Sequence, residues 1–382
     1  MKKVLSLILA AALSMSVLLT GCSSGEAASS AASGDTSSAA SSDTSSSEGS
    51  SETTQTSGKS KIAYVTGTGG LGDKAFNDLG NKGIEQLKSE GIECDVVEPK
   101  AIAEVEGILR NLADTESYAL IISMGGDSVD SITRVANDYP EQNFMVMDGL
   151  AGDIANLRSV MLSQADECFL VGAFAGLMEK EGNLPNSQGK NMIGVVGGMD
   201  IPLIRSVVAA YTAGAKYVNP DCEVLSAYVG SWSDPNKGAE LTKSMYSQGA
   251  SIVFNGAGAS GMGCIEAAKQ EGLYAIGYDG NQNSLAPDNV IGSGVRGLDA
   301  VIVQSSKEAL EGTFTGGDMN VTMADNPDAS QLELTETNVE IPDSVLEKLE
   351  KIKEFLIAAE VAIPEDPADV DAYLEQVGSF EG

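Results

Sequence analysis

A glycine-rich loop, placed between an apolar run and a long helical pattern, constrains the fold of this chain more than any other stretch. The loop runs from Gly67 to Asn77 and follows an apolar run from Lys61 to Thr66 that predicts a buried strand. The helical pattern after it extends to about Glu90. Because such a loop leaves backbone N–H groups open at the start of a helix, the sequence predicts an α/β fold with a ligand site here.

The spacing of the loop glycines allows a second interpretation. Gly67 begins a G-x-G-x-x-G pattern, which is the fingerprint of dinucleotide binding, and Asp95 or Glu98 follows at about the right distance for a ribose contact. Asp73, however, comes directly after the last glycine of the pattern. Its carboxylate would repel a pyrophosphate, so the sequence disfavours a dinucleotide site.

The N-terminal stretch predicts export. It begins with Lys2 and Lys3, continues as a mostly apolar run from Val4 to Leu18, and reaches Leu19-Thr20-Gly21-Cys22, which resembles a bacterial lipobox. The apolar run is short for a transmembrane anchor. We expect residues 1–21 to be a lipoprotein signal peptide and Cys22 to carry the lipid, on the extracytoplasmic face of the cell membrane. That location does not fit a cytosolic nicotinamide enzyme.

The next stretch has the composition of a tether. Residues 22–60 are rich in Ser and Thr, and the apolar side chains needed for a core are scarce, so we expect a disordered segment. As a flexible chain it would reach roughly 35 Å from the membrane. The residues after it are numerous enough for two lobes with separate cores.

Charge and composition exclude several classes of function. The net charge of −32, with 23 Lys and Arg, argues against nucleic acid, anionic lipid and strongly anionic ligands, nucleotides included. Histidine is absent, which removes Ser-His-Asp and Cys-His catalysis and most zinc sites. The sequence therefore predicts no catalytic residue, no metal site and no cofactor.

The cysteines show no C-x-x-C pair. Apart from Cys22 they are widely spaced, and no disulfide framework is visible. We expect these four to be small buried apolar residues: Cys94, Cys168, Cys222 and Cys264.

Strand patterns and helix patterns alternate along the rest of the chain, which predicts parallel sheets covered by helices on both faces. Strands are expected at 61–66, 93–98, 118–123, 143–147, 158–162, 191–196, 223–229, 251–254 and 274–278. The stretch 290–297 is expected to cross back to the first lobe, and helices are expected at 298–311 and 343–358. The predicted N-terminal lobe comprises residues 61–163 and 293–317, and the C-terminal lobe residues 164–292 and 318–382.

Polar residues gather shortly after the predicted strands, where doubly wound sheets bind their ligands. They are Asp73, Asn77, Asp148, Trp232, Asp234 and Asp279. Any one of them alone is more typical of a cap or a turn. Their common placement favours a cleft for a polar ligand.

Several motifs together resemble one family. Gly-Asp-Lys-Ala-Phe-Asn at 72–77 is similar to the Asp-Asp-Lys-Ser-Phe-Asn signature of the basic membrane lipoprotein (BMP) family of substrate-binding proteins. Further ordered matches lie at 139–140, 144–148, 169–172, 194–198, 230–234, 257–261 and 277–282. The resemblance implies an α/β type I periplasmic-binding fold, two doubly wound parallel-sheet lobes joined by a hinge. It also implies delivery of a ligand, commonly a purine nucleoside, to the permease of an ABC importer.

The resemblance also implies ligand-binding residues. Phe76 matches the signature Phe, and Trp232 stands where the family usually has Phe, so the two rings would stack on a purine. Asp148 and Asp279 would accept hydrogen bonds from ribose hydroxyls. Arg296 stands where the family usually has Lys and could pair with these carboxylates.

Further residues complete the predicted site. Asp73 and Asn77 would serve partly the ligand and partly their own helix, and Gly258, like Gly261, would let the backbone approach the ligand. The family usually has Asp where this chain has Gly67, and that Asp resembles a base-edge contact. The choice of base therefore stays open, as does another ring-bearing or sugar-like ligand.

The combined interpretation is an extracytoplasmic solute-binding lipoprotein without catalytic activity, which delivers a purine nucleoside or a related neutral polar ligand to an ABC importer. One alternative is a sensor that presents its ligand to a membrane receptor. Another is an exported nucleoside-processing enzyme that uses Asp73 and Asp279 as an acid/base pair.

Overall fold

The computed structural model describes residues 58–162 and 164–381 of the chain. The predicted signal peptide, Cys22 and nearly all of the predicted tether lie outside the described residues, so export and lipidation stay predictions. Within the described part, none of the helices is both long and apolar enough to cross a bilayer.

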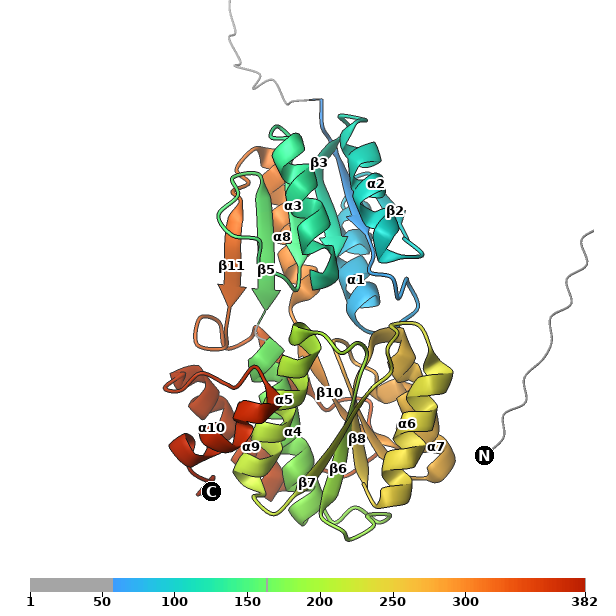
Figure 1. Cartoon of the computed structure of the whole chain (residues 1–382), viewed down its shortest axis with the longest axis vertical. Helices are drawn as coiled ribbons and strands as arrows, with labels where there is room; N and C mark the ends of the chain where they lie inside the picture. Colours follow the sequence, from blue (N-terminus) through green and yellow to red (C-terminus); the bar gives the residue numbers. More distant parts are fainter. Residues whose placement is uncertain (1–57, 163, 382) are drawn as a thin grey trace, which may run out of the picture. The chain divides into compact units, whose positions relative to one another are not determined.

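The first lobe contains a six-stranded parallel sheet in the order β11-β5-β4-β3-β1-β2 (Figure 1). Its strands are β1 (Lys61–Val65), β2 (Cys94–Val97), β3 (Tyr118–Met124), β4 (Phe144–Met147), β5 (Leu157–Leu162) and β11 (Gly317–Val321). Its helices are α1 (Phe76–Ser89), α2 (Ile102–Ala113), α3 (Val129–Asp138) and α8 (Leu298–Glu311).

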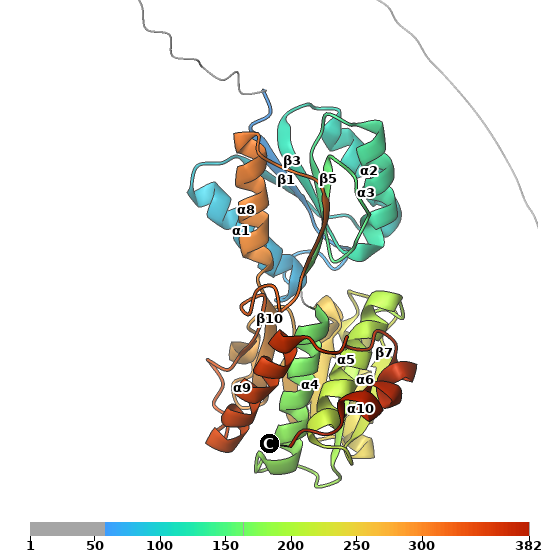
Figure 2. The ribbon, with the colours of Figure 1, turned by 90° about the vertical axis from the view of Figure 1, so that its left-hand side faces the viewer.

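Both faces of this sheet are buried, as the apolar strand patterns predict. Along β1 the side chains alternate: Ile62 and Tyr64 pack in the cluster of α1 and α8, whereas Ala63 and Val65 pack in the cluster of α2 and α3. Figure 2 shows these two helix pairs on opposite sides of the sheet. All seven residues of the central strand β3 are buried, which is typical of a strand inside a parallel sheet.

The second lobe repeats this arrangement with the order β12-β10-β9-β8-β6-β7, and only the edge strand β12 is antiparallel. The strands are β6 (Met192–Gly197), β7 (Glu223–Tyr228), β8 (Ile252–Gly256), β9 (Tyr274–Gly277), β10 (Val290–Arg296) and β12 (Ser330–Glu333). The helices are α4 (Gln164–Glu181), α5 (Pro202–Val218), α6 (Pro235–Gln248), α7 (Met262–Glu271), α9 (Asp343–Ala358) and α10 (Val370–Val377). The predicted fold class, two doubly wound lobes, is confirmed.

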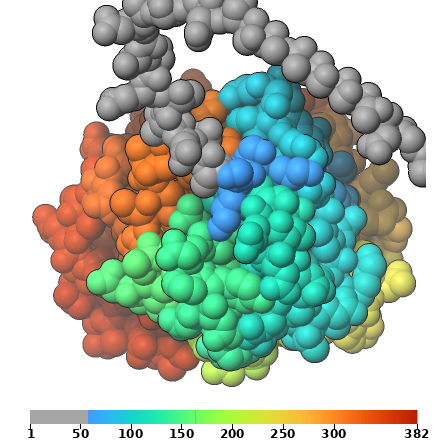
Figure 3. All heavy atoms as spheres, turned by 90° about the horizontal axis from the view of Figure 1, so that it is seen from above, coloured from blue at the N-terminus to red at the C-terminus, as the bar shows by residue number. Residues whose placement is uncertain are grey.

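The crossings between the lobes differ in detail from the sequence-based boundaries. The strand β10 pairs within the second sheet as far as Arg296, because β12 runs antiparallel beside its last four residues. The strand β11 pairs with β5 in the first sheet as far as Val321. In the space-filling view of Figure 3, the orange segment that includes α8 adjoins the blue-to-green segments of the first lobe. Neither β11 nor β12 was expected, because neither has a clear apolar pattern.

Helix α4 is buried on nearly all sides, and glycines let α5 pack directly against its backbone. A Cβ atom built at Gly172 would lie 2.0 Å from the carbonyl oxygen of Tyr211, and one at Gly214 would lie 2.0 Å from that of Phe169. The helix α9 covers α4 on another side, with Leu349 and Ile352 in the same cluster (Figure 2). Helix α4 is therefore enclosed by α5, α9 and one face of the second sheet.

We expect Gly172→Ala to lower the free energy of unfolding by about 1–3 kcal/mol, because the helices must move apart to admit the methyl group. The matched control is Gly107→Ala in α2, where a new Cβ meets nothing within 4 Å. That substitution should raise the free energy of unfolding by about 0.5–1 kcal/mol, since alanine favours a helix interior. Urea denaturation of both variants measures the difference, and a stabilised Gly172→Ala would contradict the tight packing.

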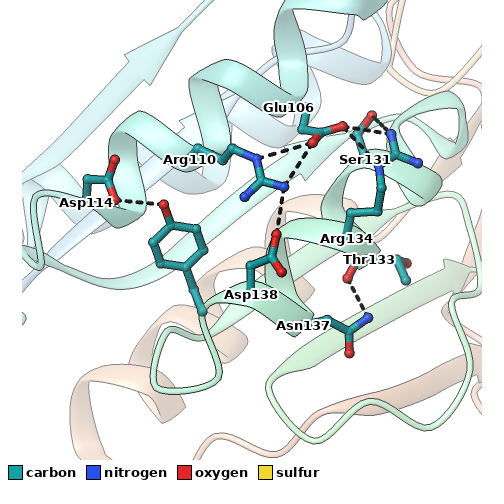
Figure 4. Close-up of polar contacts among 9 residues, drawn as sticks. Glu106, Arg110, Asp114, Ser131, Thr133, Arg134, Asn137 and Asp138 are labelled. Carbon is teal, nitrogen blue, oxygen red and sulfur yellow. Dashed lines mark hydrogen bonds and ion pairs between the residues drawn. The ribbon is translucent and has the colours of Figure 1, made fainter.

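An ion-pair network joins α2 to α3 on the surface of the first lobe (Figure 4). Glu106 accepts from Arg134 at 2.8 Å and from Arg110 at 3.0 Å, and Arg110 also pairs with Asp138 at 2.8 Å. The hydrogen bonds from Arg134 and Arg110 lower the pKa of the Glu106 carboxyl. The network is partly exposed to solvent, so it fixes the geometry of the two helices more than it adds to stability.

The described cysteines are free. Cys168, Cys222 and Cys264 are buried as predicted, and Cys94 is half-buried.

Candidate functional site

Loops at the carboxyl ends of strands from both sheets line a cavity of about 630 Å³, which includes its opening to solvent. Seven of the eight residues predicted to bind ligand line it: Asp73, Phe76, Asn77, Asp148, Trp232, Gly258 and Asp279. The eighth, Arg296, lies behind the wall and contacts two of them. The strands thus deliver their C-terminal loops to one place, as the doubly wound topology requires.

Two aromatic side chains reach the cavity from different lobes. Phe76 is the first residue of α1 in the first lobe, and Trp232 lies in the loop between β7 and α6 of the second. Both are half-buried. The indole lies directly on Gly198, where a built Cβ would be 2.4 Å from the Trp232 ring, and close to Gly258, where it would be 3.5 Å away. The two glycines leave the space in which the indole lies.

Asp73 caps helix α1 with its side chain. Its Oδ1 accepts from the backbone N–H groups of Ala75 at 3.0 Å and Asp78 at 3.1 Å. Its Oδ2 accepts from the backbone and side-chain N–H groups of Asn77, at 3.0 and 2.9 Å. Burial raises the pKa of this carboxyl, against the effect of those bonds. The four bonds use the acceptor capacity of a carboxylate. The start of α1 therefore engages the Asp73 side chain, which the sequence predicted to serve partly the ligand.

Asn77 connects the glycine loop to α1. Its Oδ1 accepts from the backbone N–H of Gly67 at 2.8 Å, and its side-chain amide donates to Asp73. The buried hydroxyl of Tyr64 donates to the Asn77 carbonyl at 2.8 Å. Asn77 therefore holds the loop in place, and its side-chain oxygen is already engaged.

The predicted partner of the carboxylates, Arg296, is at the centre of a buried charge cluster. Its guanidinium binds Asp148 with two hydrogen bonds, at 2.7 and 2.9 Å, and Asp279 at 2.6 Å. Asp148 follows β4 in the first sheet, whereas Arg296 ends β10 in the second, so the pair joins the two lobes. Fork geometry on a carboxylate of this kind is specific to arginine.

A third carboxylate, Glu167, lies 3.2 Å from the Arg296 Nε and is fully buried. Burial raises its pKa well above the ordinary value, and the Asp279 charge adds to the effect. Burial also raises the pKa of Asp279 to about 6, although the charge of Arg296 opposes this. One guanidinium thus faces three carboxylates, and the pKa shifts show that the cluster does not readily hold all three negative charges.

The sequence interpretation missed Glu167 and several other residues. A carboxylate just before the apolar stretch of α4 could have signalled a buried charge. Other residues line the cavity although the sequence did not predict them to bind ligand; they include Asp127, Gln164, Leu203 and Tyr278. Gly261 serves internal packing instead of the cavity, because a Cβ there would lie 1.4 Å from the Asn255 side-chain oxygen.

A second contact joins the two lobes. The fully buried Gln282 of the second lobe donates from Nε2 to the backbone carbonyl of Lys74 in the first, at 3.0 Å. Its Oε1 accepts from Asn255 at 3.0 Å and from the Tyr278 backbone at 3.1 Å. Hydrogen bonds within the second lobe therefore fix the orientation of the Gln282 amide that donates to Lys74 of the first lobe.

Comparison with known proteins identifies the family. A family model described as ABC transporter substrate-binding protein PnrA-like matches residues 59–365. Basic membrane protein D of Borreliella burgdorferi is 31% identical over 315 residues, which cover 81% of this chain and 89% of that protein. The CD4+ T-cell-stimulating antigen of Listeria monocytogenes is 28% identical over 328 residues, covering 80% of this chain and 88% of that protein.

The fold is shared with solved structures. A crystal structure of an ABC transporter system solute-binding protein from Aeropyrum pernix K1 superimposes with a TM-score of 0.74 at 23% identity, covering 83% of this chain and 97% of that one. The resemblance first noted in residues 72–77 is confirmed by the family match. The chain belongs to the PnrA-like (BMP) family of ABC transporter substrate-binding proteins.

Proposed function

We propose that this chain binds a purine nucleoside, or a closely related neutral polar ligand, and delivers it to an ABC importer from the outer face of the cytoplasmic membrane. The observation that carries the proposal is one cavity lined by the rings of Phe76 and Trp232 from different lobes and by the buried carboxylates of Asp148 and Asp279. Flat heteroaromatic rings stack well between aromatic faces, and carboxylates accept from neighbouring hydroxyls. A purine nucleoside combines both features.

Membrane attachment through Cys22 is part of the proposal. The lipobox supports it, and two related proteins, from Pyrococcus abyssi and Pyrococcus horikoshii, are named as lipoproteins. A tether between lipid and lobes would let the protein reach a permease while staying at the membrane.

The proposal includes no catalytic step. The alternative enzyme would use Asp73 and Asp279 as an acid/base pair, but Asp73 is engaged by the start of α1 and Asp279 by Arg296. Contacts between the lobes suit a binding protein whose closed form is recognised by its permease. Two such contacts are the Asp148–Arg296 ion pair and the Lys74–Gln282 hydrogen bond.

Titration calorimetry on the full chain in detergent tests the ligand class. We expect adenosine, guanosine or inosine to bind, and the corresponding monophosphate to bind at least about tenfold more weakly. The reason is charge: the cavity carries three lining aspartates besides Asp73, and the chain as a whole has a net charge of −32.

Two outcomes would contradict the proposal: no nucleoside binds, or the monophosphate binds as tightly as the nucleoside. Release of free base during the incubation would instead favour the enzyme. Mass spectrometry of small molecules that co-purify with the protein gives an independent view of the natural ligand. Sensor and importer are separated by reconstituting uptake with the permease.

A further inference from the structure

Asp127 is a carboxylate in the cavity wall that makes no hydrogen bond or ion pair with another described residue. It lies in the 3-10 turn Gly126–Ser128, between β3 and α3. It lines the cavity together with Gly125 and Gly126, and solvent reaches its side chain. Its position at the carboxyl end of a central strand is that of a ligand-binding residue.

The other carboxylates of the cavity wall are engaged. The start of α1 occupies both oxygens of Asp73, and Arg296 binds Asp148 and Asp279. Asp127 therefore differs from them in that no other described residue engages its carboxylate. Partial burial against the cavity wall raises the pKa of its carboxyl, and a hydrogen bond from its own backbone N–H opposes this. N–H donors on a ligand would stabilise the charged form that this environment disfavours.

The order of the strands places Asp127 relative to the proposed ligand. β3 lies between β4, which is followed by Asp148, and β1, whose loop leads to Phe76. The turn also lies close to cavity residues of both lobes. A Cβ built at Gly126 would be 2.1 Å from the carbonyl oxygen of Asp148 in the first lobe and 3.7 Å from Leu203 in the second. With the sugar at Asp148 and the ring against Phe76, an edge of the base would run along Asp127.

We propose that Asp127 determines the choice of base by accepting hydrogen bonds from two adjacent N–H groups, and that it thereby favours guanine. This inference rests on the proposed nucleoside function. The two oxygens of a carboxylate match a pair of parallel N–H donors. Guanine presents N1–H and N2–H side by side, and hypoxanthine presents N1–H alone. Adenine presents the unprotonated N1 beside its amino group, and that lone pair repels a carboxylate.

The test is calorimetry of the detergent-solubilised full chain with guanosine, inosine and adenosine. Wild type should prefer guanosine to inosine by about tenfold or more, the worth of one hydrogen bond to a charged acceptor, and adenosine should bind most weakly. Asp127→Asn keeps the shape of the side chain but offers one acceptor atom, so the preference for guanosine should fall to within about twofold. The matched control is Asp130→Asn, an exposed aspartate in the first turn of α3 that does not line the cavity; it should preserve the wild-type ranking.

Each other outcome overturns the inference. Equal binding of guanosine and inosine by wild type, or an unchanged preference in Asp127→Asn, shows that Asp127 does not read the base. An equal loss for all three nucleosides in Asp127→Asn places the carboxylate on the sugar. These three results leave the proposed function standing, because nucleosides still bind. If none of the nucleosides binds wild type, the proposed function fails and the inference fails with it.

Discussion

Replacing Arg296 with Met should lower the free energy of unfolding at pH 7 by about 3–5 kcal/mol, the usual cost of removing one partner from a buried ion pair. The side chain of Arg296 has no exposed surface, and its removal leaves Asp148, Asp279 and Glu167 without their cation. Methionine fills much of the same volume. The decrease in the free energy of unfolding therefore comes mainly from the missing positive charge, and only to a small part from a cavity. Urea denaturation measures it, with Arg205→Met as the control, because Arg205 forms an exposed pair with Asp200.

The decrease in the free energy of unfolding caused by Arg296→Met should be larger at pH 7 than at pH 5. A carboxyl whose pKa is higher in the folded protein than in the unfolded chain binds more protons when folded, so the free energy of unfolding falls as pH rises between the two values. For Asp279 these are about 6 in the fold and about 3.9 in the unfolded chain. Without Arg296 the folded value rises further, and the penalty at pH 7 grows. An equal loss at both pH values, or a loss as small as that of Arg205→Met, would show that the cluster is not electrostatically coupled.

Replacing Trp232 with Ala should weaken nucleoside binding by about 1–3 kcal/mol, the usual worth of a stack between a base and an aromatic ring. That range corresponds to a dissociation constant raised roughly 5- to 150-fold. Trp232→Phe retains an aromatic face and should recover most of the affinity. Calorimetry on the three proteins gives the comparison.

The same residue provides a spectroscopic test. Trp232 is the single tryptophan of the chain, so ligand-induced changes in tryptophan emission report on this position alone. Saturating nucleoside should change the emission, since the indole lies at the cavity. Full affinity in Trp232→Ala together with unchanged emission in wild type would assign the indole to the packing against Gly198.

Arg296 couples stability to the two-lobe arrangement. The ion pair with Asp148 spans the lobes, as does the hydrogen bond from Gln282 to Lys74. The ion pair involves the cavity residue Asp148, and Arg296 also binds the cavity residue Asp279. A ligand that contacts these carboxylates would therefore act on the same groups that hold the lobes together, so we expect ligand binding and the arrangement of the lobes to be linked.

Local pattern determined the secondary structure, the buried faces and the family. The apolar run of β1 and the alternation of strands and helices follow from side-chain periodicity, which needs no knowledge of distant contacts. The bounds of α8 and α9 agree with the helical patterns at 298–311 and 343–358. The motif at 72–77 pointed to the family. Five cavity residues were located because strands of parallel sheets end at a common edge, namely Asp73, Asn77, Asp148, Trp232 and Asp279, and the family resemblance added Phe76 and Gly258.

Tertiary structure decided how those residues are used. Asp73 and Asp148 look alike in sequence, each following a strand, yet one caps a helix and the other pairs with Arg296 from another lobe. Glu167 joins that cluster from a distant helix, whereas no other described residue pairs with the Asp127 carboxylate. The short strands β11 and β12 form because the edge of a neighbouring strand offers them backbone hydrogen bonds. Their own side-chain patterns do not predict these strands. Pairing of charges and pairing of edges depend on which segments meet in space, and periodicity along one segment carries no information about that.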